Sequence, residues 1–219
     1  METIRKSFAD ELREMKQDIL KMGSVVEEML AGSMHALQLR DTMLADEVIA
    51  KDDVVDGYNV VIEQRCLRLL ALQQPMAGDL RTIAAGLYII KDVERMGDYA
   101  LDIAKAAKKL AEREPVEDLV TIAKMAEIVQ RMLHDSLHAY VNQNIAVVSQ
   151  VADQDFEVDA LYRQAHNHLV ALVQEKPETA LAAVELILVA RYLERIADHI
   201  TNVGERIAYM QTGEIKELH

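Results

Sequence analysis

The sequence predicts an all-α protein made of two tandem three-helix bundles, and three observations lead to this prediction. The 219-residue chain contains 11 Met, only 4% aromatic residues and no Trp, and it is rich in Ala, Leu and Glu. This composition favours helices over a β-sandwich. Apolar residues recur at alternating spacings of four and three, the period of a helix packed along one side. An internal repeat then divides the chain into two equivalent halves.

The first half is expected to form three helices. The first helix ends before Asp41-Thr42, a pair that favours a helix stop followed by an N-cap. The second is expected over residues 43–73 and ends at Gln74-Pro75, because proline cannot continue the hydrogen-bond ladder. The third is expected over residues 76–112. The apolar stripe of the first helix consists of Phe8, Leu12, Met15, Ile19, Met22, Val26 and Met29.

The second half repeats the first. The segment MLAGSMHAL at 29–37 returns as MLHDSLHAY at 132–140, with five identities in nine residues at an offset of 103. The segment ERMGD at 94–98 returns as ERIAD at 194–198, at an offset of 100. We therefore predict two homologous domains, residues 1–113 and residues 114–219. The second is expected to hold helices over 115–143, 147–174 and 177–211, with Pro115 and Pro177 in first turns.

Charge and composition exclude several classes of protein. Lys and Arg number 24 against 37 Asp and Glu, giving a formal charge of −13. Nucleic acid and anionic membrane surfaces both require clustered positive charge, so neither is an expected partner. The single cysteine, Cys66, excludes a disulfide framework and fits a reducing cytosol. The start of the sequence lacks the apolar core of a signal peptide, and the longest apolar run, about eight residues over 83–90, is too short to span a membrane.

Acidic residues interrupt the apolar stripes of the second and third helices at matching places in both halves. Each interrupting acid is followed by a second acid four residues later, on the same helix face. Counting residues from the turns at Gln74 and Lys176, and taking a rise of about 1.5 Å per residue, places the pairs of neighbouring antiparallel helices at one level. Four carboxylates are therefore expected together in each half. They are Asp52, Asp56, Glu94 and Asp98 in the first half and Asp155, Asp159, Glu194 and Asp198 in the second.

Two interpretations of these carboxylates stay open. Lys91, Arg95, Arg191 and Arg195 lie within one helical turn of the acids, so the groups could be surface ion pairs. Alternatively, all-oxygen clusters suit Mg, Mn, Ca or oxidised iron, with zinc also possible. A ferritin-like di-iron oxidase would need Glu-x-x-His pairs, and no Glu of this sequence has His three residues later.

The whole chain resembles the PhoU family, the accessory regulators of bacterial phosphate transport. The resemblance rests on the duplicated architecture, on LLALQQPMAGDLR at 69–81 and on the acidic pairs, of which ERMGD at 94–98 is one. It implies that the eight acids named above are metal ligands, with iron, zinc, Mg or Mn as the ion. The two sites are not identical, because Asp102 of the first half corresponds to Asn202.

The resemblance also implies a function. Such a protein is expected to be a cytoplasmic, non-enzymatic negative regulator of phosphate uptake and of the phosphate-starvation response. Its expected partners are the ATPase subunit of the phosphate ABC transporter and the phosphate-sensing membrane histidine kinase, and a homodimer is expected. The alternative is a helical adaptor that works without metal.

Overall fold

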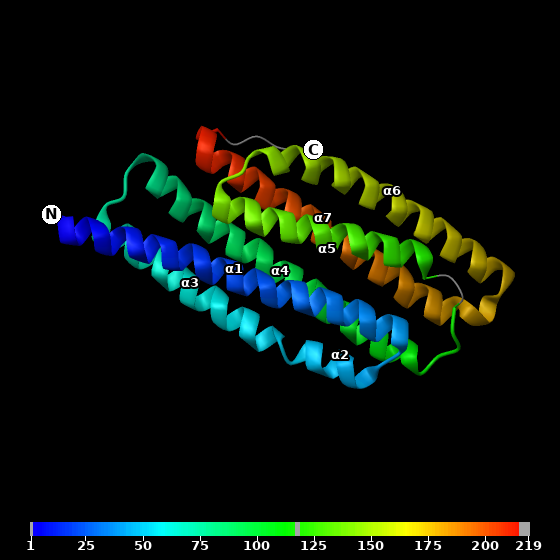
Figure 1. Cartoon of the computed structure of the whole chain (residues 1–219). Coiled ribbons are helices and arrows are strands. Elements are labelled where there is room, and N and C mark those ends of the chain that lie inside the picture. The colour runs from blue at the N-terminus through cyan, green and yellow to red at the C-terminus, as the bar shows by residue number, and fades with distance from the viewer. Residues whose placement is uncertain (1, 117–118, 215–219) are drawn as a thin grey trace.

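The computed structural model describes residues 2–116 and 119–214, with side chains from Phe8 onward, and within these ranges its regular structure is helical throughout (Figure 1). The all-α prediction is therefore confirmed. No helix in these ranges is long and apolar enough to cross a bilayer. The helices are α1 (Glu2–Leu39), α2 (Thr42–Ile49), α3 (Asp52–Gln73), α4 (Ala77–Ala111), α5 (Val120–Asn142), α6 (Ala146–Glu175), the 3₁₀ turn η1 (Pro177–Thr179) and α7 (Ala180–Thr212).

The helices form two three-helix bundles that lie side by side. Helices α3, α4, α7 and α6 follow one another as neighbours, and the α4–α7 contact between the two halves is the most extensive in the molecule. Helix α1 packs on α3 and α4, and α5 packs on α6 and α7, so these two cover one face of the four-helix row (Figure 1). Helix α2 packs on α1 and α4.

The core follows the predicted stripes closely. In α1, Met15, Ile19 and Met22 are fully buried, whereas Phe8 and Leu12 near the start of the helix are only partly buried. In α4, Ile83 and Ile90 are fully buried. Leu80 is 44% exposed, because it lies in the first turn of α4 beside the α3–α4 connection.

Two helix boundaries differ from the prediction. The expected helix over 43–73 is two helices, since α2 ends at Ile49 and α3 begins at Asp52. The sequence has no Gly or Pro at this break, but the acidic pair Asp52-Asp53 occupies the first turn of α3, where negative charge is favourable. In the second half the chain at Pro115 is not helical, and α5 begins only at Val120.

The helix stop before α2 is confirmed. The carboxylate of Asp41 accepts hydrogen bonds from the backbone N–H groups of Met43 and Leu44, both at 3.0 Å. It thereby satisfies two of the four donors that a helix leaves unpaired at its start. Pro177 also begins its element as predicted, although that element is the short turn η1, which leads into α7.

Candidate metal centre: two acidic clusters

The first acidic cluster lies between α3 and α4. Asp52 and Asp56 occupy the first two turns of α3, and Glu94 and Asp98 occupy adjacent turns in the middle of α4. Burial raises the pKa of Asp52 above its usual value, and repulsion from Asp56 and Asp98 raises it further. Burial likewise raises the pKa of Glu94, and repulsion from Asp98 on the same helix and from Asp56 on α3 raises it further. The predicted level-matching of these four carboxylates therefore agrees with the electrostatics of the folded chain.

The second cluster lies between α6 and α7 and is more deeply buried. Asp155 and Glu194 are only 7% and 8% exposed, while Asp159 and Asp198 are half-buried. Burial raises the pKa of Glu194 to about 7, and Asp198, Asp159 and Asp155 add repulsion that Arg191 partly offsets. At neutral pH this carboxyl group is thus poised between its charged and neutral forms.

Arginines on the same helices pair with these acids, as the ion-pair interpretation expects. Arg95 Nη1 lies 2.8 Å from Asp98 Oδ2, and Arg195 Nη1 lies 2.8 Å from Asp198 Oδ2. Arg191 Nη1 donates to Glu194 Oε1 at 2.5 Å. All these guanidinium groups are more exposed than the acids they contact.

Among the described residues, one buried carboxylate oxygen of these clusters accepts no hydrogen bond. Glu194 Oε2 is buried and accepts no hydrogen bond from the residues that the structure describes, and it lies 3.4 Å from Arg195 Nε. A buried acceptor without a hydrogen bond destabilises the folded state by about 1–3 kcal/mol. The donor chemistry of both clusters, oxygen only and acidic, fits a hard divalent or trivalent cation.

The arrangement seen here, however, is not a finished coordination sphere. Within residues 2–116 and 119–214, no three His, Cys, Asp or Glu side chains are grouped closely enough to hold a metal ion as they stand. Loading either cluster would require its carboxylates to draw together and to part from arginines such as Arg95 and Arg195. The eight-residue ligand set therefore stays a prediction.

The small residues beside the acids serve close helix packing. A Cβ atom placed on Gly97 would lie 3.4 Å from Val55 Cγ1 and 3.6 Å from Val26 Cγ2. The space beside Glu94 and Asp98 is thus filled by valine side chains of α3 and α1. Ala197, the counterpart of Gly97, is fully buried in the same way.

A polar seam between α4 and α7 was not predicted. Asp92 Oδ1 accepts a hydrogen bond from Asn202 Nδ2 at 3.1 Å and lies 2.9 Å from His199 Nδ1. At the position related by the internal repeat, Tyr99 stacks on Tyr192 with ring centroids 5.8 Å apart. The sequence offered only one signal for this seam, the exchange of Asp102 for Asn202, because the contacts depend on how the two halves pack together.

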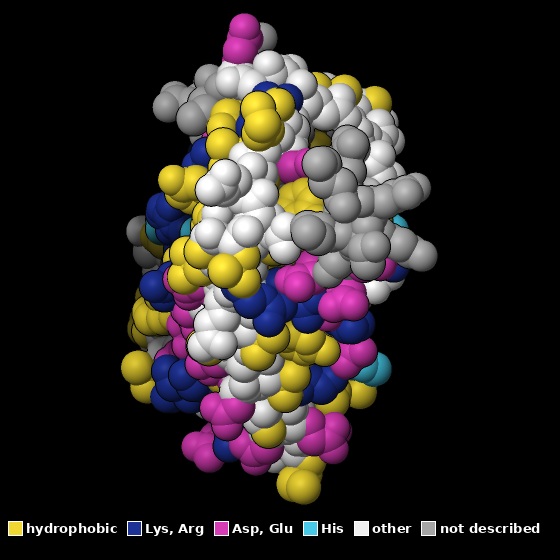
Figure 2. Space-filling view, turned by 90° about the vertical axis from the view of Figure 1, so that its left-hand side faces the viewer, with side chains coloured by type: hydrophobic (Ala, Val, Ile, Leu, Met, Phe, Trp, Pro, Cys, Tyr) yellow, Lys and Arg dark blue, Asp and Glu magenta, His cyan; other side chains and the backbone are white. Residues whose placement is uncertain are grey.

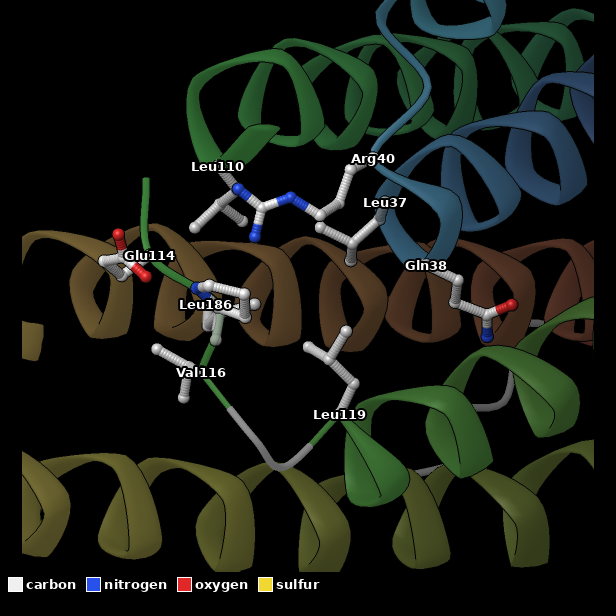
Figure 3. A pocket seen from close by; sticks show the side chains of 9 residues that line it. Leu37, Gln38, Arg40, Leu110, Glu114, Val116, Leu119 and Leu186 are labelled. Atoms are coloured by element: carbon white, nitrogen blue, oxygen red, sulfur yellow. The ribbon is translucent and has the colours of Figure 1, made fainter. Parts of the chain in front are cut away.

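A separate small cavity lies where the two halves are joined (Figure 3). It measures about 120 Å³, and leucines from three helices, Leu37, Leu110 and Leu186, form much of its wall. Arg40 closes one side and donates to the backbone carbonyls of Ala111 and Arg113. No acid of either cluster lines this cavity, so it is distinct from the candidate metal centre.

The fold and the placement of the acids define a class of protein: a duplicated helical bundle with acidic residues at equivalent positions of each half. Two segments of the chain, residues 19–107 and 122–207, match the PhoU domain. The chain belongs to the PhoU family. The predicted division between residues 113 and 114 falls in the connection between the matched segments, and these domain bounds stay a prediction.

Known proteins resemble the chain over nearly its full length. It is 38% identical over 216 residues to the phosphate-specific transport system accessory protein PhoU homolog of Clostridium acetobutylicum, covering 98% of this chain and 99% of the relative. The homolog of the same name in Aquifex aeolicus is 43% identical over 205 residues, covering 94% and 93%. The crystal structure of PhoU from Pseudomonas aeruginosa matches with a TM-score of 0.91 and 32% identity, covering 94% of this chain and all of that one. The phosphate transport system regulatory protein PhoU from Streptococcus pneumoniae matches with a TM-score of 0.89 and 32% identity, covering 95% and 99%.

Proposed function

We propose that this chain is an accessory protein of a phosphate-specific transport system and represses phosphate uptake and the phosphate-starvation response when phosphate is plentiful. The observation that carries this proposal is the extent of the similarity. Relatives described as phosphate-transport accessory proteins match both halves of the chain, over 94–98% of its length in the two named above. A function that depended on only one half of the chain would not require the relatives to match both halves.

The proposed mode of action is protein contact in the cytoplasm, without catalysis. The partners are the ATPase subunit of the phosphate ABC transporter and the membrane-bound histidine kinase that senses phosphate, and the working form is a homodimer. Long helices packed over one continuous core make a rigid body, which suits a protein that bridges two partners. A pull-down of each partner with the full chain, at high and at low phosphate, tests these contacts separately.

We further propose that metal ions belong to the working protein. Asp52, Asp56, Glu94 and Asp98 would hold one site, and Asp155, Asp159, Glu194 and Asp198 the other. Iron, zinc, Mg or Mn would there supply positive charge that offsets the repulsion raising the pKa values of Asp52, Glu94 and Glu194. The acids of each site would then tie α3 to α4 and α6 to α7.

A second candidate function is a helical adaptor that works without metal. The ion pairs of Arg95, Arg191 and Arg195 favour it, since these cations already neutralise part of each cluster. In this case the acids would matter only for stability and for the choice of partner. The two candidates predict different behaviour of variants that keep the shape of the acid but remove its charge.

Deletion of the gene followed by complementation distinguishes the metal-dependent regulator from the metal-independent adaptor. Deletion should raise phosphatase and transporter expression in phosphate-rich medium, and the intact gene should restore repression. The double variant Glu94→Gln with Glu194→Gln should fail to restore it if metal is needed, whereas Glu157→Gln, an exposed acid of α6 paired with Lys124, should succeed. Unchanged expression on deletion would refute the regulatory role itself. Full repression by the double variant would instead favour the metal-independent adaptor.

A further inference from the structure

An apolar groove lies at the end of the molecule where α1 begins, away from both acidic clusters. It measures about 480 Å³, and α1, the start of α4 and the end of α5 form its walls. Figure 2 views the molecule from this end and shows hydrophobic, basic and acidic side chains close together on it. The residues that line the groove are Phe8, Ala9, Leu12, Arg13, Lys16, Gln17, Asp79 and Val141.

The groove exists because the apolar stripe of α1 continues beyond the core. Met15 and Ile19 on this stripe are fully buried, but Phe8 and Leu12, the two preceding stripe positions, are only partly covered. Val141, near the end of α5, adds a third partly covered apolar side chain. The bundle therefore leaves a short apolar strip with no helix packed over it among the described elements.

The side chain of Lys16, whose positive charge is only partly compensated, lies beside this apolar strip. Lys16 is half-buried, and no carboxylate of the described side chains lies within ion-pair distance of its ammonium group. Burial lowers the pKa of Lys16, and the more distant Asp79 offsets only part of this effect. The neighbouring Arg13 is already paired with Asp10 at 2.7 Å. A half-buried ammonium group without a partner is unfavourable, and an incoming carboxylate would relieve this condition.

We propose that this groove is a docking site for an amphipathic helix of a partner protein that carries an acidic side chain next to its apolar residues. Apolar side chains of that helix would cover Phe8, Leu12 and Val141, and its carboxylate would pair with Lys16. An added β-strand is excluded as the recognition mode over the described residues, because their regular structure is helical and offers no sheet edge.

The proposal is independent of the metal sites. Asp79 at the groove lies fifteen residues before Glu94 on α4, which is about 22 Å along the helix axis. A failure of the groove proposal therefore leaves the proposed function untouched, and a failure of metal binding leaves the groove proposal untouched.

Selection from a displayed library of 16-residue helical peptides with random side chains tests the proposal on the full-length protein. The selected peptides should carry Leu, Ile or Phe at spacings of three and four, with Asp or Glu one turn away. Fluorescence anisotropy of a labelled selected peptide should show about tenfold weaker binding to Lys16→Glu and to Leu12→Gln. Replacing the acid of the peptide by Lys should restore part of its binding to Lys16→Glu, which a merely misfolded variant would not do.

Matched variants at the other end of the molecule serve as controls. Lys176→Glu and Leu181→Gln change an exposed lysine and an exposed leucine near η1, and neither should alter peptide affinity. The proposal is overturned if the library yields no binder, if the binders lack acidic residues, or if Lys16→Glu binds them as tightly as the unaltered chain. It is also overturned if sedimentation shows a dimer that Leu12→Gln dissociates, because a second copy would then occupy the groove.

Discussion

Replacing Glu194 by Gln should stabilise the metal-free protein above neutral pH. The pKa of Glu194 is raised from 4.5 to about 7, mainly by burial and then by Asp198. Between these pH values the folded chain keeps a proton that the unfolded chain releases, so the free energy of unfolding falls as the pH rises through this window. Below pH 4.5 both states are protonated and the destabilisation is absent, while above pH 7 it is fully present.

The size of the effect follows from the same values. A difference between 4.5 and about 7 corresponds to about 3 kcal/mol at most. Gln weakens the hydrogen bond that Arg191 Nη1 donates to the carboxylate, which removes about 1 kcal/mol, and water at the edge of the cluster screens part of the rest. The net gain in stability at pH 8 should therefore be about 1–2 kcal/mol, and near pH 4.5 it should be close to zero or slightly negative.

Urea unfolding followed by circular dichroism, in the presence of a chelator, measures this difference at pH 4.5, 6 and 8. Glu157→Gln on the same helix pair is the control, and it should change stability little at any pH because Glu157 forms only an exposed ion pair. The reasoning is refuted if Glu194→Gln is no more stable than the unaltered chain at pH 8. It is equally refuted if the difference between the two proteins does not depend on pH.

Four further substitutions test other parts of the structure by thermal or urea unfolding. Asp41→Ala removes the N-cap of α2 and should destabilise by about 1 kcal/mol; no loss would mean that the cap is unimportant. Tyr140→Phe removes a fully buried hydroxyl that has no hydrogen-bond partner among the described residues, and it should be neutral or stabilise by up to about 1 kcal/mol, whereas a clear loss would reveal a partner. Gly23→Ala would place a Cβ in steric overlap with the buried side chain of Leu137 and should destabilise the protein by about 1–3 kcal/mol. Gly57→Ala is the matched control, because the space around Gly57 is open, and it should stabilise the protein by about 0.5–1 kcal/mol. Equal effects of the two substitutions would contradict the packing described.

The fold was predictable because the apolar pattern and the repeat act locally along each helix. Met15, Ile19 and Met22 were placed in the core by spacing alone, and they are fully buried. The break between α2 and α3 was missed because Ala50 and Lys51 are ordinary helix residues. The late start of α5 was missed because proline tolerates a first turn without requiring one.

For the candidate site, only the pairing of the helices that carry the acids could be predicted from the sequence, and the ligand set stays a prediction. Helical rise and antiparallel pairing set the four acids of each half against one another, and repulsion among them is evident in the raised pKa values of Asp52 and Glu194. Their exact separations depend on rotamers and on arginine partners, which spacing does not determine. The contacts of Asp92 with His199 and Asn202 could not be predicted from the sequence, because they arise only where the two halves meet.

The metal content of the purified protein tests the central claim most directly. The full-length chain would be equilibrated with Mn, Zn or Fe, dialysed, and its metal per chain measured by mass spectrometry, alongside Glu94→Gln, Glu194→Gln and the Glu157→Gln control. The proposal predicts at least one ion per cluster in the unaltered chain and in the control, with each cluster variant losing the ions of its own half. A ratio near zero in the unaltered chain, or a ratio unchanged by both cluster variants, would contradict it.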